Sequence, residues 1–206
     1  HRLSIESHGR QAEEDTGSIF VNGPEAVHTA CLLAFLATMT LVAASRHLGV
    51  LWVAVEATTL ATAPLIYFHR QPRSLEATWK YLLVCSVGIA LALLGNFLLV
   101  VASAAPDGTG GTLVVRELVA QGAELRTPWL KAAFVFLLVG YGTKMGLAPM
   151  HTWLPDAHSE APSPVSALLS GALLNCAFLG ILRAHSICSA AGLGGFSGNL
   201  LAGFGL

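Results

Sequence analysis

Long apolar runs are the feature that most constrains this chain. Residues Tyr81–Ala105 are 25 positions without a charged side chain, and a helix needs about 20 predominantly apolar residues to cross a hydrocarbon core about 30 Å thick. Similar runs, long enough or nearly so, are Val27–Ser45, Leu48–Phe68, Ala132–Met150 and Val165–Leu182. The period-two alternation of a barrel strand does not occur. The sequence therefore predicts an all-α, polytopic transmembrane helical bundle.

Composition favours a membrane protein without a cofactor of its own. The chain is 54% hydrophobic and 11% charged, whereas soluble domains are about 25% charged. Its net charge of −1 makes neither nucleic acid nor an anionic membrane surface an obvious partner, whereas the apolar composition makes the lipid bilayer one. The four cysteines form no C-x-x-C pair and match no zinc or iron–sulfur spacing. We therefore expect neither a metal nor an electron-carrying group in this chain.

The ends of the chain resemble cuts in a longer membrane protein. It begins at His1 instead of methionine, and an apolar run that starts at Phe196 stops after 11 residues, too few for a span. We expect a polar tail over residues 1–26, followed by five full spans and the start of a sixth over residues 27–206. Arginines divide equally between the two sides, so they give no orientation in the membrane.

The segment GTKMGLAPMHTWLPDAHSEAPSPVSALLSGALLN, residues 142–175, carries most of the functional information. It places one amine, Lys144, inside an apolar run and surrounds it with Gly142, Gly146 and Pro149. A charge within a bilayer is costly and marks ion or proton pathways. Broken backbone at that depth lines a cavity or is buried in protein. We predict a discontinuous helix around Lys144, interrupted between about Gly140 and Pro149.

Three polar side chains fall at similar depth on three predicted spans. Glu56 lies near the middle of the second span, Lys144 near the middle of the fourth and Asn175 near the middle of the fifth. Buried opposite charges generally find each other, so Glu56 and Lys144 are expected to form a buried pair. The alternative is a static ion pair that only holds helices together.

Further candidates lie at the membrane boundary. Lys80 begins its helix, where it either snorkels to the interface or serves as a relay. The cluster His151, Asp156, His158 and Glu160 could bind a metal, but its prolines and histidine spacing favour proton transfer, since histidine titrates near pH 6.5. A hydrogen-bonded loop residue is the plainer interpretation of His158. Trp153 is expected to anchor or pack this loop at the interface.

The motif block, with LWVAVEATTL and SLEATWKYLL upstream, resembles the antiporter-like membrane subunits of respiratory complex I, Mrp cation/proton antiporters and energy-converting hydrogenases. Among them it is most similar to hydrogenase-4-type members, over about Val27–Leu206. The resemblance implies two inverted five-helix repeats, each with a broken helix, of which this chain holds the first. It also implies that Glu56 is the coupling glutamate, Lys144 the pumping lysine and Lys80 an additional lysine.

One position departs from several members of that family. They carry Lys or His on the helix after the motif, whereas here Asn175 and Ser170 occupy the candidate places, as Asn does in hydrogenase-4-type chains. This departure favours a water-bridged proton step through Asn175, Ser170 or His158.

The resemblance implies a subunit that translocates protons through the Glu56–Lys144 pair in a redox-driven complex of hydrogenase-4/formate-hydrogenlyase or NADH:quinone oxidoreductase type. Implied partners are other membrane subunits and a peripheral arm with nickel–iron or iron–sulfur centres, in a bacterial or archaeal plasma membrane. An Mrp-type cation/proton antiporter subunit without a redox partner is the main alternative, and a structural scaffold is the third.

A switch between Glu56 and Lys144 would give such a subunit its mechanism. Desolvation by apolar neighbours favours a neutral amine, while a nearby ionised carboxylate favours a charged one. The hypothesis is that Lys144 holds its proton while Glu56 is close and releases it when helix movement separates them.

Overall fold

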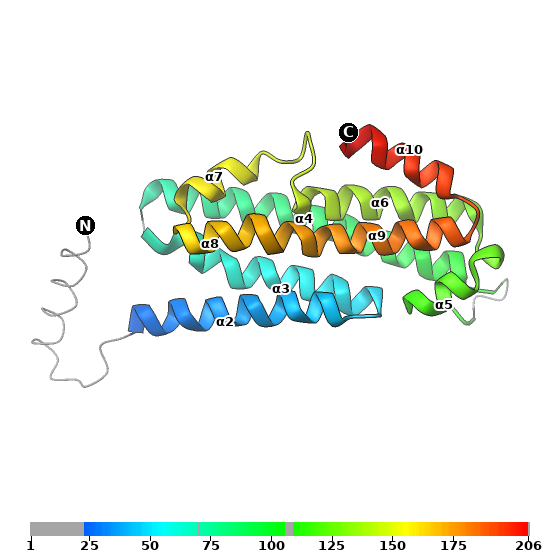
Figure 1. Ribbon diagram of the computed structural model, residues 1–206, viewed down its shortest axis with the longest axis horizontal. Helices are drawn as coiled ribbons and strands as arrows, with labels where there is room; N and C mark the ends of the chain where they lie inside the picture. The colour runs from blue at the N-terminus through cyan, green and yellow to red at the C-terminus, as the bar shows by residue number, and fades with distance from the viewer. Residues whose placement is uncertain (1–22, 70, 106–108, 206) are drawn as a thin grey trace, which may run out of the picture.

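Parallel long helices build the molecule. The computed structural model describes residues 23–69, 71–105 and 109–205, and these form an elongated bundle (Figure 1). Its long helices are α2 (Gly23–Ala44), α3 (Leu48–Ile66), α4 (Pro72–Ser103), α6 (Thr127–Met145) and α9 (Leu174–Ala190). Shorter helical segments are η1 (Tyr67–His69), α5 (Val115–Ala120), η2 (Gly122–Glu124), α7 (Trp153–Glu160), α8 (Ser163–Leu168), η3 (Leu169–Leu173) and α10 (Gly194–Gly205). In these ranges no strand occurs beyond a single bridge between His47 and Val114, which confirms the all-α prediction.

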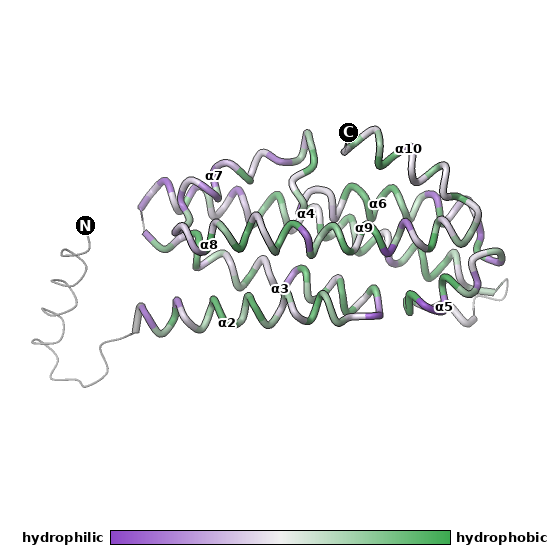
Figure 2. The backbone as a smooth tube through the Cα atoms, in the orientation of Figure 1, coloured by the Kyte–Doolittle hydropathy of each residue, from purple (hydrophilic) through white to green (hydrophobic). Residues whose placement is uncertain are grey.

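Four helical stretches are long and apolar enough to cross a membrane: Glu25–Ala44, Leu48–His69, Pro72–Ser103 and Ser163–Ala190. Large apolar side chains on the outside of the bundle, such as Leu83 and Val87, are more than 60% exposed, as lipid-facing residues would be. Apolar colour predominates in the middle of these helices, interrupted by a few polar positions, and polar colour gathers near α7 and α5 (Figure 2). The number of five full spans stays a prediction, because α6 is not among these four candidate spans. The predicted polar tail, residues 1–26, lies mostly outside the described residues.

Glycines allow α6 to lie directly against α4. A Cβ atom on Gly140 would lie 2.6 Å from the backbone nitrogen of Ala92 and from the carbonyl oxygen of Gly88. A Cβ on Gly88 would lie 2.7 Å from the Thr143 side chain. Small residues of this kind let membrane helices approach closely, so that packing replaces the missing hydrophobic driving force. This contact sets the position of the end of α6, and therefore of Lys144, against α4.

A valine at Gly140 should separate α4 from α6. The obstructing atoms belong to the backbone of α4, so side-chain rotation cannot relieve the clash, and overpacking of this kind costs about 1–3 kcal/mol or more. The yield and thermal stability of the intact protein in detergent should fall. The matched control is Gly198→Val in α10, where an added Cβ meets nothing within 4 Å. Equal stability of the two variants would contradict this account of the α4–α6 contact.

The predicted interruption around Lys144 is confirmed. Helix α6 ends at Met145, and Gly146 adopts a left-handed conformation with φ 82°. The amide of Leu147 donates to the Gly142 carbonyl at 2.9 Å, and that of Gly146 to the Thr143 carbonyl at 3.2 Å. This pair of bonds is the Schellman arrangement that closes a helix at glycine. The break is therefore completed by Gly146, before Pro149 is reached, and α7 begins only at Trp153.

A second irregularity lies in the helix after the motif, which the sequence predicted as one plain span. Residues Leu169–Leu173 form a π-helical turn between α8 and α9. Such a turn inserts an extra residue into the helical repeat and rotates the side chains that follow it. It therefore changes which way Asn175 faces, a point that matters for the candidate site.

Candidate functional site

Lys144 is fully buried, with 0% of its surface exposed. Its Nζ donates hydrogen bonds to Thr59 Oγ1 of α3 at 2.9 Å and to the Tyr81 hydroxyl of α4 at 2.5 Å. The same Nζ lies 4.4 Å from the centroid of the Tyr81 ring and 6.0 Å from that of Trp153. Three helices and the segment after the break thus converge on one amine.

Three physical effects make this position tolerable for a charged amine. Hydrogen bonds to hydroxyl groups replace part of its lost hydration. The aromatic faces of Tyr81 and Trp153 attract a cation, by about 2 kcal/mol where water is excluded. Lys144 also lies in the last turn of α6, where the negative end of the helix dipole favours positive charge. Both protonation states of the amine can be accommodated, because Thr59 and Tyr81 can each donate or accept.

Glu56 reaches the site through Thr59 and not directly. The Thr59 hydroxyl donates to Glu56 Oε2 at 3.4 Å, and the Ser86 hydroxyl donates to Oε1 at 3.2 Å. The ion pairs found within the described residues involve Lys80 alone, so the direct Glu56–Lys144 pair is absent from this structure. Glu56 and Thr59 are three residues apart and share one face of α3. The carboxylate and the amine are therefore separated by a single hydroxyl group.

Aromatic and hydroxyl groups around the amine are held by their own hydrogen bonds. The Tyr81 hydroxyl and Thr62 Oγ1 are 2.6 Å apart. Trp153 Nε1 donates to the Thr143 carbonyl at 2.8 Å, which ties the start of α7 to the end of α6. Trp153 is fully buried and packs against Tyr81, with ring centroids 5.1 Å apart. Trp153 therefore packs inside the bundle and holds the segment after the break against α4.

Lys80 lies outside this cluster, although it neighbours Tyr81 in sequence. Its side chain is 50% exposed and forms ion pairs with Glu76 at 2.8 Å and with Asp156 at 3.0 Å. Adjacent helical residues point in directions about 100° apart, so the amine of Lys80 faces away from Lys144. Asp156 belongs to α7, so this pair joins the segment after the break to α4.

Within the described residues, no hydrogen bond connects His151 or His158, the two histidines predicted to carry protons, with Lys144. The His158 Nδ1 lies 2.7 Å from the Ser166 hydroxyl, which connects α7 to α8. Partial burial lowers the pKa of the His158 imidazole and keeps it neutral near pH 7. His151 is exposed in the turn before α7. Across the residues that are described, no group of three His, Cys, Asp or Glu side chains could hold a metal ion.

Asn175 and Ser170 bind the backbone of their own helix. Asn175 Nδ2 donates to the Gly171 carbonyl at 2.6 Å. Ser170 Oγ donates to the carbonyls of Ser166 and Ala167 at 3.2 Å. Both side chains are exposed; Ser170 lies within the π-helical turn, and Asn175 follows it. The structure therefore does not bring them to the amine.

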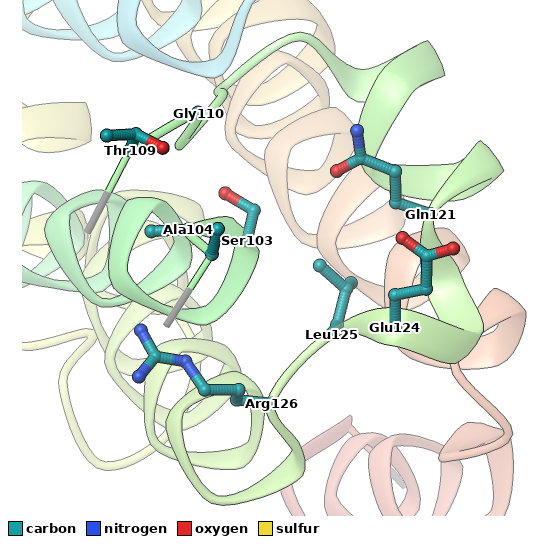
Figure 3. Close-up of a pocket in the computed structure, with 9 residues that line it drawn as sticks. Ser103, Ala104, Thr109, Gly110, Gln121, Glu124, Leu125 and Arg126 are labelled. Atoms are coloured by element: carbon teal, nitrogen blue, oxygen red, sulfur yellow. The ribbon is translucent and has the colours of Figure 1, made fainter. Parts of the chain in front are cut away.

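One pocket lies far from Lys144. It has a volume of about 450 Å³ and collects polar side chains at the end of α4 (Figure 3). Its walls include Ser103, Gln121, Glu124 and Arg126, and the Arg126 guanidinium donates to the Val101 carbonyl. Ser103 is 22 residues along α4 from Tyr81, roughly 33 Å at 1.5 Å per residue. The pocket therefore belongs to the opposite end of the bundle.

Comparison with known proteins identifies the family. The transmembrane family of NADH:quinone oxidoreductases and Mrp antiporters matches residues 45–201. The chain is 43% identical over 174 residues to the hydrogenase-4 component F homolog of Methylacidiphilum infernorum (isolate V4), covering 84% of this chain and 37% of that protein. It is 38% identical over 156 residues to the F(420)H(2) dehydrogenase subunit N of Methanosarcina mazei, covering 74% of this chain and 30% of that protein.

Solved structures agree with this assignment. A chain of the membrane-bound sulfane sulfur reductase, an archaeal respiratory membrane complex, superimposes with a TM-score of 0.75 at 21% identity, over 83% of this chain and 34% of that one; at this identity the match concerns the fold. A chain of respiratory complex I from Thermus thermophilus with bound aureothin gives a TM-score of 0.63 at 27% identity. The match covers 86% of this chain and 45% of that one. The present chain thus spans less than half of each of these proteins. It belongs to the NADH:quinone oxidoreductase/Mrp antiporter transmembrane family.

Proposed function

We propose that this chain is part of a membrane subunit that translocates protons in a redox-driven complex, through Glu56, Thr59 and Lys144. The observation that carries the proposal is a fully buried amine separated from a carboxylate by one hydroxyl group. Buried ionisable groups in membrane helices mark proton relays. The relatives support a redox complex, since their names are those of a hydrogenase component and a dehydrogenase subunit.

The proposed step moves one proton along the hydroxyl bridge. Lys144 Nζ gives a proton to Thr59 Oγ1, and the Thr59 hydroxyl gives its own proton to Glu56 Oε2. The amine and the carboxylate both become neutral, so the buried charge falls from a separated pair to zero. The Thr59–Glu56 contact, at 3.4 Å, is longer than a strong O–H···O bond of about 2.7 Å. A small approach of Glu56 toward Thr59 would therefore connect the path, and withdrawal would interrupt it. This order is the reverse of the sequence-based hypothesis, in which Lys144 releases its proton when Glu56 moves away, because the hydroxyl bridge conducts only when the carboxylate is close.

The proposed partners follow from the same assignment. Other membrane subunits would supply the remaining helices, and a peripheral arm with nickel–iron or iron–sulfur centres would supply the redox chemistry. The bilayer would be the plasma membrane of a bacterium or archaeon. Exterior apolar residues on the α4–α6 face, such as Leu83, Val87 and Val139, leave surface for lipid or for a neighbouring subunit.

The proposal is tested on the intact complex that contains the full-length protein. In liposomes made without Na⁺, electron transfer should acidify one compartment, as followed with a pH-sensitive dye. A complex that moves protons only in exchange for added Na⁺ or K⁺, without electron transfer, would support the antiporter alternative instead.

Removing the Thr59 hydroxyl should interrupt the bridge with little change in volume. Thr59→Val removes the group that contacts both Lys144 and Glu56, and an unsatisfied buried partner costs about 1–3 kcal/mol, or roughly 5- to 150-fold in rate. Thr59→Ser restores the hydroxyl and should restore most proton translocation. Thr58→Val is the matched control, because Thr58 is equally buried but bonds only the Val55 carbonyl of its own helix. Equal activities of the two valine variants would show that the bridge is unused.

A further inference from the structure

A second buried polar cluster lies between α4, α6 and α9. It consists of Asn96, Tyr141 and Arg183, and Asn96 and Tyr141 are 1% and 0% exposed. Within the described part of the chain, four of their polar atoms are buried without a hydrogen-bond partner: both amide atoms of Asn96, the Tyr141 hydroxyl and Arg183 Nη1. None of these residues was singled out by the sequence.

The packing of the three helices brings these groups together. The Tyr141 hydroxyl lies close enough to the Asn96 carboxamide to pair with it, and it interacts with the charge of Arg183. Such a pairing still leaves one amide atom of Asn96 and Arg183 Nη1 without a partner among the described residues. Gly95, next to Asn96, abuts Leu137, one turn before Tyr141 on α6. On the other side, a Cβ on Gly180 would lie 2.9 Å from the Tyr141 ring, so the glycine admits the ring against α9.

Several buried polar atoms without hydrogen-bond partners in one small cluster require a ligand. Each unpaired buried group costs about 1–3 kcal/mol, and native structures satisfy nearly all such groups with protein or ordered water. A buried water molecule typically makes about three hydrogen bonds, which a carboxamide, a hydroxyl and a guanidinium can supply. Water is therefore the ligand whose chemistry fits, since it both donates to the Asn96 oxygen and accepts from Arg183.

The cluster lies between the Lys144 site and one end of the bundle. Asn96 is 15 residues along α4 from Tyr81, roughly 22 Å at 1.5 Å per residue. Tyr141 and Lys144 are three residues apart and are neighbours along α6. Arg183 Nη2 donates to the carbonyl of Ala43 at 3.2 Å, one residue before α2 ends. That end adjoins the start of α5, where the amide of Leu48 donates to the Leu113 carbonyl at 2.8 Å.

We propose that Asn96, Tyr141 and Arg183 hold ordered water and that this hydrated cluster continues the proton path from Lys144 toward the end of the bundle that carries α5. The inference rests on the proposed function. Tyr141 and Asn96 would pass or orient the water protons. Arg183 stays charged, so it orients the water and opposes an uncompensated proton, which limits leakage when Lys144 is charged.

The water is tested directly by electron cryomicroscopy of the intact complex, at a resolution that shows ordered water. We expect density within hydrogen-bond distance of both the Asn96 carboxamide and the Tyr141 hydroxyl. A dry cluster, with these groups bonded to each other or to neighbouring protein, would overturn the inference whatever Lys144 does.

The path is tested by two variants in liposomes. Tyr141→Phe and Asn96→Leu should each lower the rate of proton translocation by about tenfold, which corresponds to about 1.4 kcal/mol in the barrier. Asn96→Ser, which keeps a polar group, should recover part of the rate. Leu99→Ala, a buried apolar site on the same helix, controls for packing damage and should keep the rate of the unmodified complex once assembled.

The outcomes separate the two proposals. Normal translocation in Tyr141→Phe and Asn96→Leu, with translocation lost in Lys144→Ala, would overturn the hydrated path and leave the proposed function standing. Normal translocation in Lys144→Ala would overturn the proposed function and the path with it, while the density map would still decide whether the cluster binds water.

Discussion

Replacing Lys144 with alanine should abolish proton translocation in the assembled complex. The amine is the only charged group at the meeting point of Thr59 and Tyr81 in the described site. The two hydroxyls can relay a proton, but neither can store an excess proton near neutral pH as the amine does. Lys144→Arg should also translocate poorly, because a guanidinium does not release its proton in proteins. Dye-monitored acidification of liposomes, normalised to the amount of assembled complex, measures both effects.

The control for Lys144 lies on the same helix. Lys131 is in the first turn of α6, where its Nζ lies 5.4 Å from the centroid of the Phe196 ring and its side chain is exposed. Lys131→Ala should leave translocation close to that of the unmodified complex. Full pumping by a stably assembled Lys144→Ala complex would falsify the mechanism.

Glu56→Ala should uncouple electron transfer from proton translocation. Without the carboxylate, the Thr59 hydroxyl has no acceptor to which it can pass a proton, and the charge that favours protonated Lys144 is lost. Glu56→Asp should keep part of the coupling, since it retains the charge but places it farther from Thr59. Glu56→Gln keeps a hydrogen-bonding group without charge and should resemble alanine. The ratio of protons moved to electrons transferred is the quantity to measure.

A contrary result for Glu56 would be equally informative. If Glu56→Gln keeps the full proton-to-electron ratio, the carboxylate serves only as a static acceptor for Thr59 and Ser86. The switch between Glu56 and Lys144 would then be excluded, even if Lys144 itself proved essential.

Local chemistry explains why part of the candidate site could be predicted. A charged amine in an apolar run is costly in any membrane fold, so Lys144 could be recognised from sequence alone. Gly146 and Pro149 are poor helix residues in any context, so the break could be placed as well. Glu56 was found by depth, because helical rise converts sequence position into distance along the membrane normal.

Neutral hydroxyl groups gave no comparable signal. Thr59 and Tyr81 lie in apolar helices, where threonine and tyrosine are common packing residues, and only the crossing of α3, α4 and α6 shows that both contact the amine. The direction of Asn175 was hidden for a related reason. Sequence gives its position along the helix, but the direction of its side chain depends on a π-helical turn that hydropathy does not reveal.

The sequence by itself determined the all-α fold, long apolar helices and the break after Lys144, because each depends on the cost of exposing charge or backbone to hydrocarbon. Tertiary structure alone decided that Thr59 stands between Glu56 and Lys144, that Lys80 turns to Asp156, and that Asn96, Tyr141 and Arg183 meet. These contacts depend on the rotation and register of packed helices, and glycines such as Gly140 set that register through backbone contacts with a helix distant in the sequence.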